Sequence, residues 1–380
     1  MTSRERVRKA LRHQEPDRVP LDVGGGASTS IVYDGYLALA KHLKLDYQTP
    51  VQFQSLFLQI TALDEKVMAA LGSDCRPLLA RPPKQARGGL RPDGAIVDEW
   101  GVVWYKPESS LYYEVIESPL ADATLETLER YPWPDPDDPG RTEGLAAEAR
   151  YKYENTEYAI MANPGAIDIW QRAYALRGYE QLLVDLMLDK EFVHALFRKI
   201  LDFDKRVFRN FLAETGKYID VIRTADDLAS AGSLLMSPAI YREMLKPYHK
   251  ELCDFIKAHT DAKIFYHSCG SVYPLINDLI EVGVDILNPV QVSAKNMDTA
   301  RLKEEFGARL CFWGGIDTTR VLPLGTVADV AAEVETRIKD LAPGGGFVLA
   351  AVHNIQPDVP PGNILAMCET ARKYGTYVQK

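Results

Sequence analysis

The chain has 380 residues, of which 46% are hydrophobic and 26% charged, and its formal net charge is −9. This is ordinary globular composition, with enough length for one large barrel or two smaller domains. The negative charge argues against nucleic acid or an anionic membrane as the main partner. No stretch reaches the roughly 18 uncharged apolar residues of a membrane-spanning helix, and no apolar run follows the N-terminus as in a secretory signal. The five scattered cysteines favour a cytoplasmic protein with reduced thiols.

Short apolar runs alternate along the chain with longer stretches of helical spacing. Eight runs are predicted as strands, at residues 18–23, 75–80, 158–162, 219–223, 263–266, 285–288, 310–313 and 347–352. This alternation predicts an α/β protein with a (β/α)₈ barrel, the TIM-barrel fold. An open doubly wound sheet is the alternative, and the lack of a G-x-G-x-x-G motif at a strand–helix junction disfavours it.

Helices are predicted in three segments from spacing and end signals. Residues 179–214 have room for two successive helices, and residues 326–341 form another amphipathic helix. A further helix begins at Ser237, with the serine as N-cap and Pro238 at the first helical position.

Residues 81–140 interrupt the alternation after the second strand. The pattern over residues 96–105 predicts an inserted β-hairpin. Such insertions form a lid or one wall of a pocket, and a surface decoration is an equally good interpretation. We expect residues 1–380 to form a single domain that contains this inserted lid-like segment.

Two strand ends carry side chains that bind transition metals. The fifth strand runs into His267-Ser268-Cys269, and the eighth is followed by His353. Imidazole and thiolate are ligands that Zn²⁺ prefers, and a catalytic site needs three protein ligands and an open position. His267 and Cys269 share a face if the strand continues, and we expect His353 across the mouth from them. The pattern predicts a zinc site, with Cys269 as a buried packing residue as the alternative.

Other candidate residues follow the same strands, where the active sites of such barrels lie. Asp226 and Asp227 follow the fourth strand and are candidates for tuning a metal or donating a proton to a leaving group. The candidate substrate-binding residues are Trp170, Tyr266, Asn288 and Asn354, with Tyr112 and Tyr113 from the insertion. The aromatic rings could stack on an aromatic substrate, and packing in the core is their alternative role. Cys311 lies within the seventh strand and is expected to pack inside the barrel.

Five segments together carry a family resemblance, namely residues 2–20, 163–180, 226–248, 314–317 and 353–364. They resemble the uroporphyrinogen decarboxylase superfamily over nearly the whole chain, and within it the cobalamin-dependent methyltransferases. The decarboxylase branch holds a tetrapyrrole with an N-terminal arginine-rich motif and an aspartate after the second strand. Here Gly-Gly-Gly-Ala-Ser stands at 24–28, and residues 78–81 contain no aspartate.

The His-x-Cys motif is similar to that of the zinc methyltransferases, which place a second cysteine after the last strand. This chain has His353 there, which makes it more similar to the O-demethylase branch. The resemblance implies an enzyme that moves a methyl group from a methoxylated aromatic, or another methylated small molecule, to the cob(I)alamin of a separate corrinoid protein. Zn²⁺ held by His267, Cys269 and His353 would act on the ether oxygen as a Lewis acid.

Three alternatives stay open. One is decarboxylation of a tetrapyrrole, and another is thiol-directed transfer from methylcobalamin, in which zinc lowers the pKa of the thiol. The third is a binding protein without catalysis. The methyl donor, the direction of transfer, the fourth metal ligand and the assembly state, with a homodimer among the options, are not settled by the sequence.

Overall fold

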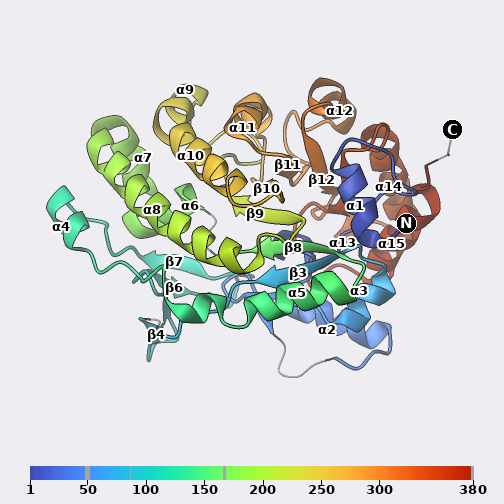
Figure 1. Ribbon diagram of the computed structural model, residues 1–380, viewed down its shortest axis with the longest axis horizontal. Helices are drawn as coiled ribbons and strands as arrows, with labels where there is room; N and C mark the ends of the chain where they lie inside the picture. The colour runs from blue at the N-terminus through green and yellow to red at the C-terminus, as the bar shows by residue number, and fades with distance from the viewer. Residues whose placement is uncertain (48–51, 86, 166–167, 378–380) are drawn as a thin grey trace.

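The computed structural model describes residues 1–47, 52–85, 87–165 and 168–377. A curled parallel sheet of seven strands forms its centre, in the order β13-β12-β11-β10-β9-β8-β3, and helices surround it (Figure 1). The strands are β3 (Cys75–Leu79), β8 (Ala159–Asn163), β9 (Val221–Ala225), β10 (Lys263–His267), β11 (Ile286–Asn288), β12 (Cys311–Ile316) and β13 (Phe347–Ala351). They correspond to the second to eighth strands predicted from the sequence.

The predicted first strand, residues 18–23, lies between β13 and β3. Leu21 pairs in parallel with Leu349 of β13, whose N–H donates to the Pro20 carbonyl at 2.9 Å. On the other side, the Asp74 N–H donates to the Leu21 carbonyl at 2.7 Å. Pro20 has no N–H to donate, so the pairing here is limited to a short bridge. The predicted TIM-barrel fold is confirmed, with this segment joining the two edges of the sheet.

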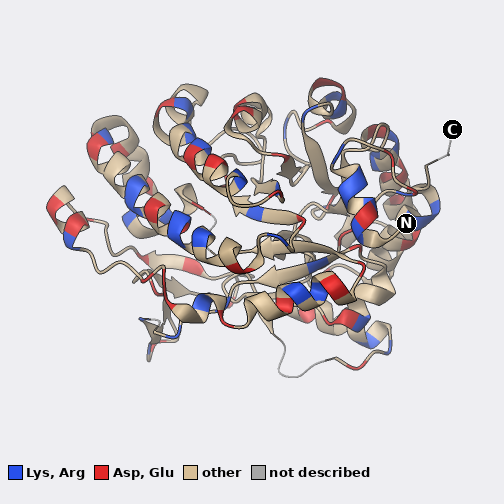
Figure 2. Ribbon diagram, in the orientation of Figure 1, with Lys and Arg blue, Asp and Glu red and all other residues tan. Residues whose placement is uncertain are grey.

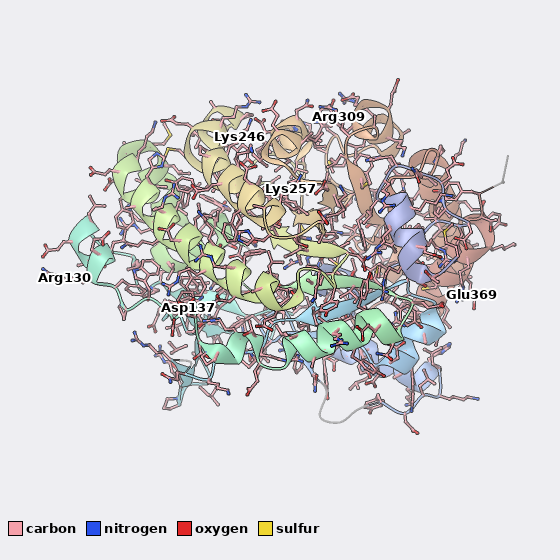
Figure 3. The ribbon with its side chains drawn as sticks, viewed as in Figure 1. Arg130, Asp137, Lys246, Lys257, Arg309 and Glu369 are labelled. Carbon is pink, nitrogen blue, oxygen red and sulfur yellow. The ribbon has the colours of Figure 1, made fainter. Side chains whose placement is uncertain are left out.

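The longer helices pack around the sheet and carry most of the charged side chains, whereas the strands are mainly uncharged (Figure 2). Lys246, Lys257 and Arg309 belong to this outer layer (Figure 3). The helices are α1 (Ser3–Ala10), α2 (Tyr33–His42), α3 (Glu65–Leu71), α4 (Leu125–Arg130), α5 (Leu145–Asn155), α6 (Trp170–Arg177), α7 (Tyr179–Leu188), α8 (Lys190–Thr215), α9 (Pro238–Ile240), α10 (Lys246–Lys257), α11 (Ile276–Val282), α12 (Thr299–Phe306), α13 (Val321–Leu324), α14 (Val327–Leu341) and α15 (Pro361–Tyr374).

The helix predictions are confirmed. The two helices predicted over 179–214 are α7 and α8, and the helix predicted over 326–341 is α14. Ser237 caps α9 as expected, because its side-chain oxygen accepts the N–H of Ile240 at 3.2 Å. In the described part of the chain, no helix is both long and apolar enough to cross a membrane.

Alternate strand residues fill the interior of the barrel. One buried cluster contains Cys75, Ala159, Met161, Val221, Phe265, Ile286, Cys311, Trp313, Val348 and Ala350, with Val7 and Leu11 from the first helix and the residue after it. Cys311 therefore packs inside the barrel, as predicted. Because Val7 and Leu11 join this cluster, α1 covers the N-terminal end of the barrel. The C-terminal ends of the strands form the opposite end, where the active sites of such barrels lie.

The segment after β3 forms a second, antiparallel sheet in the order β4-β5-β6-β7 (lower left in Figure 1). Its strands are β4 (Gly89–Leu90), β5 (Ile96–Val97), β6 (Val103–Tyr105) and β7 (Glu114–Glu117). The predicted hairpin is present as β5 and β6, with Ile96 opposite Trp104. The two outer strands were not predicted, because residues 89–90 and 114–117 lie outside the pattern of residues 96–105 on which the hairpin was predicted. A separate two-stranded sheet joins β1 (Phe53–Ser55) to β2 (Ile60–Thr61). The single-domain organisation stays a prediction.

Candidate metal centre

Three donor side chains meet at the C-terminal ends of β10 and β13. His267 is the last residue of β10, Cys269 lies two residues further, and His353 lies two residues beyond β13. Their donor atoms all lie within 4.8 Å of one another, and the Sγ of Cys269 is 3.4 Å from Nε2 of His267. Donor atoms of a tetrahedral zinc ion lie roughly 3.5 Å apart, given Zn–N and Zn–S distances of about 2.0 and 2.3 Å. The residues present therefore fit zinc.

The expectation that His353 lies across the mouth from the other two residues was wrong. Its ring centroid is 5.3 Å from that of His267. The strands β10 and β13 are separated by two others in the sheet, but side chains at their ends turn toward the same narrow axis. A small barrel is just wide enough for inward side chains to fill it, so the two imidazoles meet.

Asn288 of β11 fixes the orientation of the His267 ring. Its Oδ1 is 2.6 Å from Nδ1 of His267, and its Nδ2 donates to the carbonyl of Trp313 at 3.0 Å. Because the amide nitrogen is committed to a carbonyl, the amide oxygen must accept the proton on Nδ1. Nε2 is then left with a free lone pair facing Cys269, which is the tautomer that binds a metal. Asn288 is fully buried, and its predicted contact with substrate stays a prediction.

Burial keeps both imidazoles neutral. Desolvation, followed by the charge of Arg223, lowers the pKa of His267 to about 3. Desolvation, followed by the neighbouring His267, lowers the pKa of His353 to about 4. Burial and the nearby Asp227 raise the pKa of the Cys269 thiol well above its ordinary value. A metal ion that binds here meets two imidazoles ready to coordinate and one thiol whose proton it must displace.

Asp227 is the member of the aspartate pair that reaches the cluster. Its Oδ1 accepts the N–H of Cys269 at 2.7 Å and lies 4.0 Å from Nε2 of His267. Its Oδ2 accepts from the side chain of Gln171 at 3.3 Å. The side chain is 32% exposed, so this carboxylate is beside the cluster and partly open to solvent.

Asp226 has a different environment. It is fully buried, and its carboxylate accepts the N–H groups of Ile169 and Gln171 at 3.1 and 3.0 Å. Its Oδ2 also lies 2.7 Å from Nε2 of His249 in α10. This carboxylate joins the start of α6 to α10, and its hydrogen bonds leave it facing away from the cluster. The two predicted catalytic aspartates therefore lie in different environments, and Asp227 is the one that remains a candidate for a catalytic role.

Two aromatic residues predicted to bind substrate lie elsewhere. Trp170 has no exposed surface and packs edge-on against Tyr174 and Tyr179. Tyr266 turns to the outer face of β10, because side chains alternate along a strand, and its ring packs against His249. Both residues thus pack in the core, which was the alternative role considered for them.

Asn354 and Tyr112 connect the insertion to the site. Asn354 follows His353 and is buried, and its Nδ2 lies 3.3 Å from the hydroxyl of Tyr112. The same hydroxyl accepts from the side chain of Gln356. The insertion thus places one aromatic ring beside the metal-binding residues, while its role as a lid stays a prediction.

Arg223 of β9 is a residue of the site that the sequence analysis did not select. It registers with Phe265 of β10, which belongs to the interior cluster, so its side chain also turns into the barrel. It is only 9% exposed. The sequence contained a signal for this inward position. Arg223 lies two positions after Val221, which belongs to the interior cluster, and every second residue of a strand shares a face.

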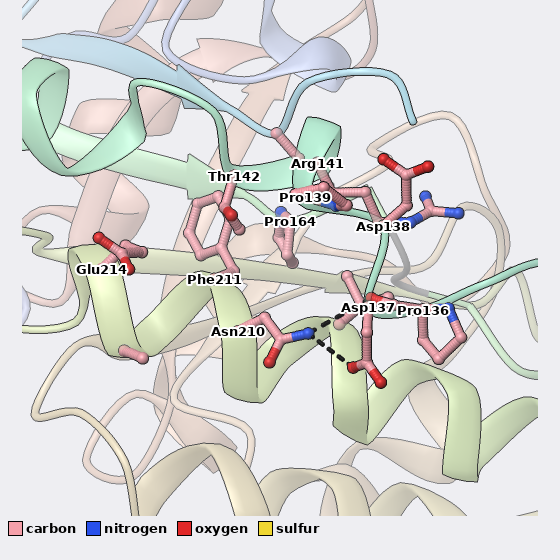
Figure 4. A pocket seen from close by; sticks show the side chains of 13 residues that line it. Pro136, Asp137, Asp138, Pro139, Arg141, Thr142, Pro164, Asn210, Phe211 and Glu214 are labelled. Carbon is pink, nitrogen blue, oxygen red and sulfur yellow. Dashed lines mark hydrogen bonds between the residues drawn. The ribbon is translucent and has the colours of Figure 1, made fainter. Parts of the chain in front are cut away.

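A separate pocket lies outside the barrel, between residues 136–142 and α8 (Figure 4). It has a volume of ≈ 320 Å³, and the side chain of Asn210 donates to Asp137 at its edge at 2.8 Å. None of the three metal-binding candidates lines this pocket. It is therefore distinct from the candidate metal centre.

Comparison with known proteins agrees with this architecture. Residues 115–374 match the family model described as uroporphyrinogen decarboxylase (URO-D). The chain belongs to the URO-D family. The resemblance at superfamily level predicted from the sequence is therefore confirmed.

Two curated members of the URO-D family show the extent of the sequence similarity. The uroporphyrinogen decarboxylase of Chlorobium phaeobacteroides is 28% identical over 160 residues, which cover 40% of this chain and 42% of that protein. The enzyme of Chlorobium phaeovibrioides is 27% identical over 192 residues, or 49% and 50% of the two chains. The chain thus spans about half the length of the curated relatives it matches.

A solved structure, a methyltransferase from Methanosarcina mazei, is similar over 98% of this chain and 99% of its own. The TM-score is 0.64 and the sequence identity 18%. This similarity shows that the two chains share the fold, including the barrel.

Proposed function

We propose that this URO-D family member is a zinc-dependent methyltransferase that moves a methyl group from a methoxylated aromatic to the corrinoid of a partner protein. The observation that carries the proposal is the cluster of His267, Cys269 and His353 at the C-terminal ends of the barrel strands. Similarity over the whole chain to a structure named as a methyltransferase supports it.

The ion would be held by Nε2 of His267, Sγ of Cys269 and the imidazole of His353. Bound zinc supplies Lewis acidity, which stabilises the negative charge that develops on an ether oxygen as its methyl group leaves. Asn288 keeps His267 in the coordinating tautomer. In the reaction the carbon–oxygen bond of the methyl ether would break with its electron pair left on the oxygen, and the methyl group would pass to the cob(I)alamin of the partner protein, which would supply the electron pair for the new bond to carbon.

Asp227 is the group placed to handle the proton of the departing oxygen. Its carboxylate is partly exposed and lies 4.0 Å from Nε2 of His267, beside any substrate bound at the cluster. A partly exposed carboxylate can take up a proton from solvent and pass it to a leaving oxygen at hydrogen-bond distance. Replacing Asp227 would therefore slow the transfer without removing the metal.

Decarboxylation of a tetrapyrrole is the second candidate, because the matching curated relatives are named uroporphyrinogen decarboxylases. Such a substrate carries several carboxylates. Among the residues of the seven central strands, Arg223 is the arginine turned into the barrel, whereas Arg76 faces outward and pairs with Glu65. One inward cation is a poor match for a polyanionic macrocycle, which favours methyl transfer.

Metal analysis and a coupled transfer assay test the proposal. We expect about one zinc ion per chain, lost in His267→Ala and Cys269→Ala and retained in two matched controls. These are His42→Ala, on the exposed end of α2, and Cys253→Ala, in the buried face of α10. With 4-methoxybenzoate and a reduced corrinoid protein, the corrinoid absorbance should change only with the zinc-loaded protein.

The competing outcomes are distinct. Freshly prepared protein without stoichiometric zinc would contradict the Lewis-acid mechanism. Release of carbon dioxide from uroporphyrinogen, unaffected by a chelator, would establish the decarboxylase instead.

A further inference from the structure

Arg223 is a buried cation without a close counter-ion. The residue is only 9% exposed, and its Nε has no hydrogen-bond partner among the described residues. No carboxylate in the described part of the chain lies within ion-pair distance of its guanidinium, although Asp168 and Asp227 lie within electrostatic range. Burial accordingly lowers the pKa of Arg223.

This arrangement is energetically unfavourable for the protein alone. An isolated charge taken out of water loses its hydration, and an ion pair offsets that loss only when the partner is close. Arginine does not escape by losing its proton, because its pKa stays above the range of ordinary pH. A guanidinium of this kind is stabilised when an anion from outside the chain supplies the missing acceptors.

The position of Arg223 relates it to the metal centre. In the sheet register, Arg223 stands beside Phe265, and the next inward row toward the mouth contains Ala225, His267 and Asn288. Ala225 ends in a methyl group, so the residue above Arg223 on its own strand is small. The charge of Arg223 contributes to the lowered pKa of His267, and it partly offsets the rise that burial causes in the pKa of Cys269. Arg223 therefore lies within electrostatic range of the cluster.

The surroundings of Arg223 indicate the kind of molecule that fits. Phe265 and Trp313 pack edge-on inside the barrel with ring centroids 5.4 Å apart, and Met161 belongs to the same interior cluster. A fork of N–H donors in an apolar environment matches a carboxylate bidentately, and an aromatic ring suits the apolar walls.

We propose that Arg223 is the anion-binding subsite of the substrate, and that it holds the carboxylate of a methoxylated aromatic acid whose methyl ether lies at His267, Cys269 and His353. The assignment of the methoxy end rests on the proposed function. The assignment of the carboxylate end rests on Arg223 and can be tested without any methyl transfer.

The experiment compares two probes of equal shape, 4-methoxybenzoate and neutral 4-methoxybenzamide, by titration calorimetry. The zinc-loaded protein should bind the acid at least tenfold more tightly than the amide. Arg223→Gln should bind the two probes equally, while Arg223→Lys should keep part of the preference, since it keeps the charge but loses the planar fork. Arg76→Gln is the matched control, because Arg76 is also a buried strand arginine but faces outward and pairs with Glu65. It should leave the preference unchanged.

Carboxylates also bind metal ions, so the titrations are repeated on Cys269→Ala protein. A preference for the acid that persists there and depends on Arg223 supports the subsite, and a preference that vanishes with the metal overturns it. Equal binding of the two probes by the unaltered protein also overturns it, even if Arg223→Gln fails to fold. If the acid is preferred through Arg223 but no methyl group is transferred, the subsite is supported and the proposed function is rejected. If methyl transfer occurs without the preference for the acid, the proposed function is supported and the subsite is rejected.

Discussion

Within the cluster, His267 is oriented by a chain of hydrogen bonds that ends on the backbone. The Trp313 carbonyl accepts from Asn288, and Asn288 accepts from the His267 ring. Cys269 is positioned in a similar way, because its N–H donates to Asp227 at 2.7 Å. The donor atoms are therefore preorganised by neighbouring strand ends, which reduces the ordering that metal binding requires.

Replacing Asn288 should weaken metal binding without removing a ligand. In Asn288→Ala we expect the zinc affinity to fall about 10–100-fold, because His267 loses the acceptor that fixes its tautomer. Asn288→Asp should retain most of the affinity, since a carboxylate also accepts from Nδ1. Competition with a chelating dye measures both constants. Asn210→Ala, on α8 outside the barrel, serves as the control, and an unchanged affinity in Asn288→Ala would reject this role.

The number of protons released on zinc binding follows from the pKa directions. At about pH 6, both imidazoles are already neutral, because burial lowers the pKa of His267 to about 3 and that of His353 to about 4. The Cys269 thiol holds its proton, because burial raises its pKa. We expect about one proton per zinc ion, and an affinity that rises about tenfold per pH unit.

Calorimetry in buffers of different ionisation enthalpy counts these protons. Histidines of ordinary pKa, about 6.5, would together add more than one further proton at about pH 6. A release of two or more protons would therefore contradict two neutral imidazoles. Working at about pH 6 avoids the ionisation of zinc-bound water, which occurs near pH 7.

At the scale of elements, one buried carboxylate connects the N-terminal segment to the barrel. Asp74 accepts from Nη1 of Arg6 at 2.7 Å, from Nη1 of Arg18 at 2.8 Å and from the Leu21 N–H at 2.9 Å. Asp74 directly precedes β3, so these bonds lie at the N-terminal ends of the strands. They hold α1 and the bridging segment of residues 18–23 together at the end away from the cluster.

Removing this carboxylate should affect stability and leave the metal centre intact. In Asp74→Ala we expect the free energy of unfolding to fall by about 3–5 kcal/mol, because buried donors of Arg6 and Leu21 lose their acceptor. Chemical denaturation measures the loss. Asp137→Ala, which removes a half-exposed partner of Arg206, should cost less than about 1 kcal/mol. If folded Asp74→Ala protein lost most of its zinc, the metal centre would depend on the N-terminal end of the barrel, which would contradict this prediction.

Elements whose signals are local were predictable. Thr326 accepts the N–H of Asp329 at 3.2 Å at the start of α14, and Asp189 separates α7 from α8 with a similar cap at 3.1 Å. Apolar spacing and capping residues act within a few positions. The outer strands of the inserted sheet depend on pairing with β5 and β6, and no short segment encodes that pairing.

At the scale of the whole molecule, the curled sheet brings β10 and β13 to one axis, so that residues far apart in sequence form one cluster. The interior is apolar toward the N-terminal end, where Val7 and Leu11 join it, and polar toward the strand ends that carry His267 and Asn288. Charged residues of both signs lie on the outer helices (Figure 2), and the formal net charge of the chain is −9. Among the residues of the seven central strands, Arg223 is the arginine that faces the interior, whereas most charged residues lie on the outer helices.

The amino-acid pattern was sufficient for the strands of the barrel, for the helices over 179–214 and 326–341, for the family, and for the three residues whose donor atoms lie close together, because each depends on residue type and short spacing. The outward turn of Tyr266 and the inward turn of Arg223 follow from alternation along a strand, but neither was recognised from the sequence. The pattern could not distinguish Asp226 from Asp227. Nor could it bring Tyr112 of the insertion to Asn354. These outcomes depend on strand register and on the closure of the barrel, which set which faces meet. The local periodicity of a strand or helix determines which side chains share a face. The pairing of distant strands determines which other side chains that face contacts.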